Sequence, residues 1–179
     1  MSQTYDVIIV GASFAGLAVA RELKGRVLVI DRKPIGTSQT SACGTLLEVP
    51  RQLSAMDAVL QTYKMGYIHT PIQTCAYHLP YAFCTLDYRR FCAILAGQAE
   101  FAFVQASVLG LEGNRLFTTN GVYQGSVLVD ASGWRASLGS QRDPRLVDQR
   151  RLSFGLEHEV PRRGDGLYFW VDPLLFNEG

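Results

Sequence analysis

The chain has 179 residues, 47% of them hydrophobic, which is enough to bury the core of one domain or slightly more. Its 17 basic and 16 acidic residues nearly cancel, so the sequence predicts no nucleic-acid partner. No apolar run is long enough to span a membrane, and no secretory signal precedes the first strand. The four cysteines form no C-x-x-C pair, which favours neither a metal site nor a disulfide framework. We expect a cytoplasmic protein, with peripheral attachment to a membrane as the alternative.

A strand, a glycine turn, a helix and a second strand follow one another at the start of the chain. We predict these elements over residues 5–10, 14–24 and 26–31. Gly11 would allow the tight turn, and Gly16 would let the helix pack close to the sheet. The helix would then present free N–H groups and its positive dipole end to the phosphates of a dinucleotide. The residues expected at this turn are Gly11, Ala12, Ser13, Ala15 and Gly16.

An acidic residue ends the second strand at the spacing typical of dinucleotide-binding folds. Asp31 follows Gly11 by twenty residues, so its carboxylate can accept both hydroxyls of an adenosine ribose, with Arg32 beside it. Ser13 replaces the central glycine of the G-x-G-x-x-G pattern, and its hydroxyl would have to donate to a phosphate oxygen. The alternative is an ordinary β-α-β unit that binds no ligand.

The rest of the chain predicts an antiparallel insertion, a helix, a meander and a returning strand. After a loop over 31–48, we expect a short helix over 50–60, paired strands over 67–70 and 75–79, and a helix over 88–99. Short strands then follow over 101–111, 115–119, 122–123, 127–130, 152–160 and 167–171, with 127–130 a buried parallel strand.

The order of these elements predicts an α/β fold with two parts. The first is a Rossmann-type domain over residues 1–145, with inserted antiparallel strands near 62–86. The second, over residues 146–179, is the start of a β-rich domain for the substrate.

Two segments resemble the fingerprints of FAD-binding oxidoreductases that have the glutathione-reductase-type Rossmann fold. The first is the glycine turn. The second is the run from residue 127 to 133, an apolar strand followed by Ala-Ser-Gly, where these proteins carry Ala-Thr-Gly or Ala-Asp-Gly. The resemblance implies FAD as the cofactor, with Asp130, Ser132 and Gly133 behind it. It also implies that Ser107 or Val108 lies beside the adenine.

Within this group the chain is most similar to the geranylgeranyl reductase family, relatives of the p-hydroxybenzoate hydroxylase fold. The similarity rests on segments 41–44, 86–91 and 167–171. It implies that Cys43 and Gly44 lie beside the flavin, with Cys43 as the catalytic candidate. A small buried side chain is the other interpretation of Cys43. Arg90 would reach the pyrophosphate. Because Tyr88 occupies the usual arginine position, the choice between Arg89 and Arg90 stays open.

The reductase resemblance implies FAD-mediated reduction of isoprenoid carbon–carbon double bonds. The substrate would be isoprenoid or lipid-like, and the electrons would come from an external donor such as NAD(P)H or ferredoxin. A flavin-dependent monooxygenase or halogenase on the same fold is one alternative, and a non-catalytic nucleotide-binding fragment is another. The family's later Gly-Asp segment is missing from the sequence, so we expect an N-terminal piece of a longer enzyme that is inactive alone.

Overall fold

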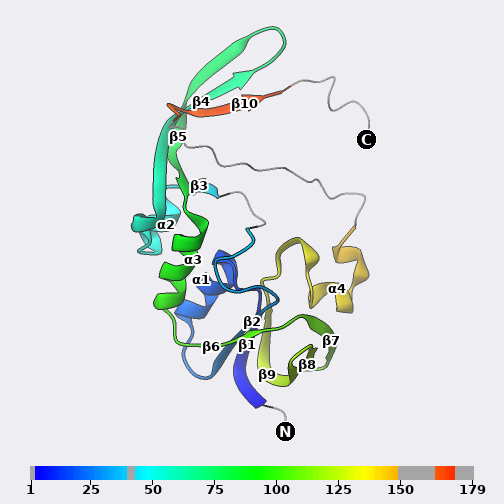
Figure 1. Cartoon of the computed structure of the whole chain (residues 1–179). Helices are drawn as coiled ribbons and strands as arrows, with labels where there is room; N and C mark the ends of the chain where they lie inside the picture. The colour runs from blue at the N-terminus through cyan, green and yellow to red at the C-terminus, as the bar shows by residue number, and fades with distance from the viewer. Residues whose placement is uncertain (1–2, 40–42, 149–163, 172–179) are drawn as a thin grey trace. The chain divides into compact units, whose positions relative to one another are not determined.

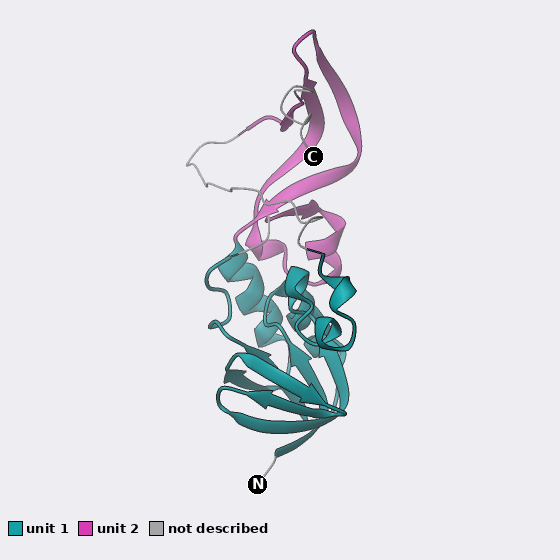
Figure 2. Cartoon of the chain, turned by 90° about the vertical axis from the view of Figure 1, so that its right-hand side faces the viewer, with its two compact units in different colours: residues 1–41, 88–156 teal, residues 42–87, 157–179 magenta. Residues whose placement is uncertain are grey.

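The computed structural model of the chain describes residues 3–39, 43–148 and 164–171. Its residues group into two compact units, which Figure 2 shows in different colours. Unit 1 comprises residues 1–41 and 88–156, and unit 2 comprises residues 42–87 and 157–179. Each unit therefore combines two separate stretches of the chain, whereas the sequence predicts two consecutive domains.

Unit 1 is built on a six-stranded sheet in the order β6-β2-β1-β9-β8-β7 (Figure 1). The four strands β6, β2, β1 and β9 are parallel, and β9, β8 and β7 form an antiparallel meander. This arrangement confirms the predicted α/β class. The strands are β1 (Gln3–Val10), β2 (Val27–Asp31), β6 (Ala102–Gln105), β7 (Val108–Glu112), β8 (Arg115–Thr118) and β9 (Gly121–Asp130).

Two helices of ordinary length accompany this sheet, and each ends two residues before its predicted end. In α1 the buried residues Gly16, Leu17 and Ala20 recur at helical spacing and form the inner face. The helix stops because Leu23 takes an extended backbone conformation, and Gly25 follows with a positive φ of 99°. The helical elements of unit 1 are α1 (Phe14–Glu22), α3 (Tyr88–Gly97), η2 (Gly133–Arg135), α4 (Gly139–Arg142) and η3 (Pro144–Leu146).

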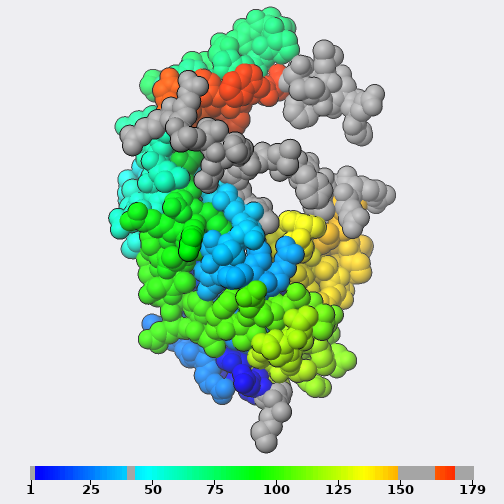
Figure 3. Space-filling model, in the orientation of Figure 1, coloured from blue at the N-terminus to red at the C-terminus, as the bar shows by residue number. Residues whose placement is uncertain are grey.

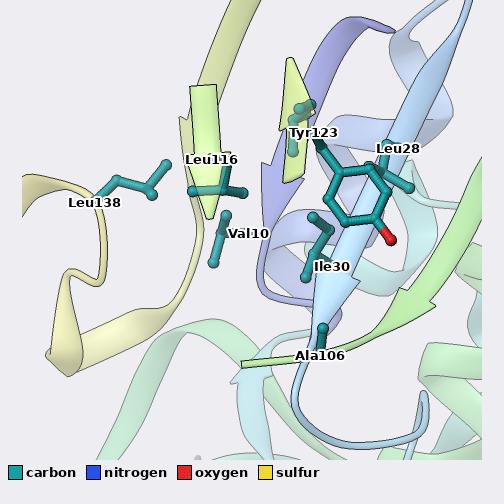
Figure 4. Packing of buried hydrophobic residues seen from close by; sticks show 8 residues of the cluster. Val10, Leu28, Ile30, Ala106, Leu116, Tyr123 and Leu138 are labelled. Carbon is teal, nitrogen blue, oxygen red and sulfur yellow. The ribbon is translucent and has the colours of Figure 1, made fainter. Parts of the chain in front are cut away.

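The core of unit 1 lies on both faces of the parallel strands. Ile8, Leu28 and Ile30 are fully buried on one face, in the cluster that Figure 4 shows with Tyr123 and Leu138. The other face buries a second cluster: Ile9, Ala12, Ala20, Val27 and Val29. Burial of each large aliphatic side chain contributes about 1.5–3 kcal/mol. These strands therefore hold the loops at their ends in fixed positions.

The returning strand is longer and less buried than the sequence predicts. Segments 122–123 and 127–130 belong to a single strand, β9, which pairs in parallel with β1 as expected. The prediction of a buried strand over 127–130 was wrong, because Val127 is 54% exposed, Asp130 is exposed, and Leu128 and Val129 are half-buried. The physical reason is the position of the strand in the sheet, because α1 packs mainly on β1 and β2, and β9 lies on the opposite side of β1 from β2.

Unit 2 contains a four-stranded sheet in the order β10-β4-β5-β3. β4 and β5 form a long antiparallel hairpin, β3 pairs antiparallel with β5, and β10 pairs in parallel with β4. β10 confirms the strand expected over 167–171, whereas the strand expected over 152–160 lies outside the described residues. The strands are β3 (Gly44–Leu46), β4 (Val59–His69), β5 (Thr74–Leu86) and β10 (Leu167–Trp170).

The prediction of a helix over residues 50–60 was wrong. Two short elements take its place, α2 (Glu48–Gln52) and η1 (Met56–Ala58). Ser54 lies between them with a positive φ of 51°, which a helix does not tolerate, and Val59 already begins β4. Leu60, expected to face inward, is 59% exposed because exposure alternates along β4 with the two-residue period of a strand.

Candidate dinucleotide-binding site

A pocket of about 340 Å³ lies in unit 1 at the carboxyl ends of β1, β2 and β9. Ligands of open parallel sheets bind at this edge, and the volume falls within the range of small-molecule sites. Figure 3 shows the segment after β2 (sky blue) next to the loop that follows β9 (yellow). Both segments contribute to the lining, which includes Gly11, Ser13, Phe14, Ala15, Asp31, Arg32, Lys33, Ala106, Ser107, Val108, Ala131, Ser132, Gly133, Arg135 and Ser137.

The two glycines of the turn have the roles that the sequence predicts for them. Gly11 has a φ of 112°, in the region that favours glycine, and it turns the chain out of β1. A Cβ atom at Gly11 would overlap the carbonyl oxygen of Ala131, in the loop after β9. A Cβ atom at Gly16 would overlap the carbonyl oxygen of Gly11, which confirms that α1 packs closely on the turn. Both positions therefore require glycine for contacts within the protein backbone itself.

The N-terminus of α1 opens into the pocket. Ser13 precedes the helix in an extended conformation, and its side chain makes no capping bond to the helix backbone. Since the first N–H groups of a helix have no acceptor within it, they can donate to an anion. Ser13, Phe14 and Ala15 line the pocket, and the first turn of α1 carries no acidic residue. The site therefore offers the donors that a phosphate needs.

Asp31 connects the ends of β1 and β2. Its Oδ2 accepts the N–H of Ala12 at 2.8 Å, and its Oδ1 accepts the N–H of Lys33 at 3.0 Å. Ala12 itself is buried and acts through this bond rather than by lining the pocket. Carboxylate oxygens have further lone pairs, so Asp31 can still accept hydroxyl groups from a ligand.

The segment after β9 is folded around Asp130. Its Oδ1 accepts the Ser132 hydroxyl at 2.5 Å, and its Oδ2 accepts the N–H groups of Leu138 and Gly139, each at 2.8 Å. Burial alone would raise the pKa of Asp130. The hydrogen bonds from Ser132, Gly139 and Leu138 outweigh that effect and lower the pKa below its usual value. Asp130 thus shapes the loop, while Ser132 and Gly133 line the pocket.

Six residues expected at the cofactor are not among the described residues that line this pocket: Ala12, Gly16, Cys43, Gly44, Arg90 and Asp130. Cys43 and Gly44 belong to unit 2, where the Cys43 carbonyl accepts the N–H of Leu86 and Gly44 packs against the ring of Phe83. Arg90 is an exposed residue of α3. Their cofactor contacts stay predictions.

Sequence reasoning missed several residues of the site. Tyr88, at the start of α3, is 7% exposed and donates its hydroxyl to Ser13 Oγ at 3.1 Å. Arg135 and Ser137 line the pocket from the loop after β9, and the Arg135 guanidinium lies 4.3 Å from the ring centre of Trp134. The signal for Tyr88 was its occurrence at the usual arginine position. The loop residues follow no periodic pattern, so the sequence carried no signal for them.

No helix within the described ranges is both long and apolar enough to cross a membrane. No protein-family model matches the sequence, and no curated protein matches it either.

Solved structures do resemble it. A geranylgeranyl bacteriochlorophyll reductase-like protein from Thermoplasma acidophilum has a TM-score of 0.66 and 18% identity, covering 80% of this chain and 43% of that protein. The flavin-dependent brominase Bmp2 has a TM-score of 0.63 and 17% identity, covering 78% and 41%. Glycine oxidase from Geobacillus kaustophilus has a TM-score of 0.55 and 18% identity, covering 79% and 59%. The chain thus spans less than half the length of the first two and shares an α/β fold with all three.

Proposed function

We propose that this chain binds FAD and forms the cofactor-binding part of an FAD-dependent oxidoreductase. The observation that carries the proposal is the convergence of three features on one pocket: the glycine turn, the uncapped start of α1 and the carboxylate of Asp31. A βαβ unit without a ligand explains the two glycines, but it leaves the helix donors facing an open cavity. The fold of the solved neighbours supports the same conclusion.

The lining of the pocket suits the adenosine diphosphate half of FAD. The pyrophosphate would lie at the start of α1, and the ribose hydroxyls would donate to Asp31. Val108 and Ser107, at the start of the meander, would lie against the adenine. Ser132 and Gly133 would close the site behind the phosphates.

The charges around the pocket suit a dianionic pyrophosphate. Among the described residues that line it, Asp31 is the one acidic side chain, and Arg32, Lys33 and Arg135 are basic. When bound, FAD supplies two-electron redox chemistry, while the protein binds and orients the cofactor and limits the access of water. The domain division proposed from the sequence assigns this binding to residues 1–145, including the insertion near 62–86, and assigns residues 146–179 to the substrate domain.

Reduction of isoprenoid double bonds is the specific activity we propose. The segments that resemble the geranylgeranyl reductases support it, and so does the likeness to the Thermoplasma acidophilum protein. An isoprenoid or lipid-like substrate would be reduced with electrons from NAD(P)H or ferredoxin. Cys43 and Gly44 would lie at the flavin, and Arg90 would lie near the pyrophosphate. The location would be cytoplasmic or peripheral to a membrane.

A halogenase or monooxygenase is the second candidate, because the brominase has nearly the same TM-score of 0.63. One experiment separates the two activities. The FAD-loaded full-length protein is incubated in two mixtures. The first excludes oxygen and contains dithionite and geranylgeranyl diphosphate. The second contains oxygen, NADPH, bromide and a phenol. Mass spectrometry of the products should show two added hydrogens per reduced double bond in the first mixture. Bromination or hydroxylation of the phenol, with the isoprenoid unchanged, would contradict the reductase assignment.

A further inference from the structure

Two positions at which the sequence departs from the patterns it resembles are bonded to each other. Ser13 stands where the dinucleotide turn has its central glycine, and Tyr88 stands where the helix-opening segment has its arginine. They are 75 residues apart in the chain, yet the Tyr88 hydroxyl lies 3.1 Å from Ser13 Oγ. Both belong to unit 1.

The ring of Tyr88 is held firmly by its surroundings. It is 7% exposed and meets the ring of Phe14 edge to face, with the ring centres 6.2 Å apart and the planes at 79°. Phe14 is the first residue of α1 and contacts Phe91 on α3 as well. The Tyr88 hydroxyl therefore reaches the phosphate turn from a side chain with little freedom to move.

In this bond the Tyr88 hydroxyl donates and Ser13 Oγ accepts. Burial raises the pKa of the Tyr88 phenol above its usual value, against the opposing effect of the bond to Ser13. The phenol therefore stays protonated at neutral pH and keeps the proton that it donates to Ser13. Ser13 Oγ accepts this proton, makes no capping bond to α1 and lines the pocket. A hydroxyl group whose oxygen already accepts one hydrogen bond can still donate its own proton to another acceptor.

We propose that Tyr88 is a positioning residue that turns the Ser13 hydroxyl into a fixed donor to the cofactor pyrophosphate. The pair supplies a neutral, aimed hydrogen bond at the place where the resembling proteins have a glycine and an arginine. The donor acts on a phosphate oxygen, and chained hydrogen bonds of this kind strengthen one another. This inference rests on the proposed binding of FAD.

A double-mutant cycle on the full-length protein tests the inference. FAD affinity is measured by calorimetry for the wild type, Ser13→Ala, Tyr88→Phe and the double variant. A lost hydrogen bond to a charged group predicts about tenfold weaker FAD binding for Ser13→Ala. Tyr88→Phe should weaken binding severalfold when Ser13 is present and have no effect in the Ser13→Ala background. Additive effects of the two changes would overturn the proposal.

Two controls separate positioning from a general structural role. Tyr123→Phe removes another buried phenol hydroxyl of unit 1, which contacts the Asn120 carbonyl outside the pocket, and should leave FAD affinity unchanged. ADP should reproduce the coupling seen with FAD, whereas adenosine, which lacks phosphates, should show none. Equal coupling with adenosine would overturn the phosphate contact.

The outcomes also separate this inference from the proposed function. A wild-type protein that is folded and binds neither FAD nor ADP contradicts both. A wild-type protein that binds FAD without coupling between positions 13 and 88 contradicts the inference alone. If Tyr88→Phe does not fold, Ser13→Ala still tests the phosphate contact on which the proposal depends, since the proposal predicts weaker binding of FAD and ADP with adenosine unaffected. Unchanged ADP binding by that variant would overturn it.

Discussion

At the scale of single residues, Asp31 has a structural task and a proposed binding task. Its carboxylate holds the N–H groups of Ala12 and Lys33 and so fixes the turn. Local spacing predicted this residue because the distance from a glycine turn to the end of the next strand is set by one β-α-β unit. Its bond to the turn, in contrast, depends on the register of β1 and β2, which the sequence alone does not show.

We expect Asp31→Ala to lower both FAD affinity and the free energy of unfolding. The loss of a charged acceptor should cost about 1–3 kcal/mol of FAD binding. Asp6→Ala is the matched control, because Asp6 also accepts a backbone N–H, from Arg26 at 2.8 Å, and does not line the pocket. Calorimetry and urea unfolding of both variants should show lower stability in each but weaker FAD binding in Asp31→Ala alone. Equal FAD affinity in the two variants would contradict the proposed contact between Asp31 and the ribose.

Asp130 should make the loop after β9 sensitive to acid. Its pKa in the folded chain lies below its usual value, so its stabilising contribution is complete above about pH 4. The contribution is lost as the pH falls through the folded pKa. Asp130→Asn should therefore be less stable than the wild type at pH 7 and lose less stability between pH 5 and pH 3. Urea unfolding at several pH values checks this expectation.

Asp143 provides the control for that experiment. Its hydrogen bonds from Arg145 also lower its pKa, but it is a surface residue outside the pocket lining. Asp143→Asn should alter how the free energy of unfolding changes at acidic pH, without changing FAD affinity. Asp130→Asn should also weaken FAD binding, because the loop that it holds lines the pocket. Equal FAD affinities for the wild type and Asp130→Asn would show that the loop does not need this carboxylate.

At the scale of elements, the prediction of secondary structure succeeded where the sequence pattern that indicates it is local. The segments that form β1, α1 and β2 combine apolar strands with a glycine turn and a helical face, and each matches its element within a few residues. The segment over 50–60 failed because Leu53, Met56 and Leu60 have helical spacing although the chain enters a strand at Val59. Long-range pairing of β4 with β5 decides that structure, and short-range periodicity does not reveal it.

The contact between α1 and its preceding turn should tolerate no side chain at Gly16. A Cβ atom there would meet the Gly11 carbonyl and the Ile9 side chain, so Gly16→Ala should destabilise the chain by about 3 kcal/mol or more. Gly97, the last residue of α3, serves as the control, because a Cβ atom added there would meet no atom within 4 Å. Gly97→Ala should be neutral or stabilise by up to about 1 kcal/mol. Thermal and urea unfolding compare the two, and equal stabilities would contradict the close packing of α1.

At the scale of the whole molecule, the two units are each assembled from distant stretches of sequence. β10 pairs with β4 across about a hundred residues, and β9 returns to β1 from a similar distance. The sequence indicated the return of β9 through its second fingerprint. It carried no local signal for the pairing of β10, so the sequence-based boundary at residues 145–146 followed chain order.

The pocket gathers residues from the same distant stretches. The glycine turn and Asp31 come from the first 31 residues, and both follow a known spacing. Tyr88 and Arg135 come from later segments. Tyr88 approaches the turn because α3 packs on α1, and Arg135 does so because the sheet order places β9 beside β1. Their part in the site could therefore be recognised only in three dimensions.

The central claim is that unit 1 holds FAD by its adenosine diphosphate half, and a nucleotide titration tests it most directly. Full-length protein freed of cofactor is titrated by calorimetry with FAD, with FMN, and with FAD in the presence of ADP. We expect saturable binding of one FAD per chain, competition by ADP, and binding of FMN at least about tenfold weaker because FMN lacks the adenosine contacts. FMN binding as tightly as FAD, or a folded protein that binds no FAD, would contradict the account.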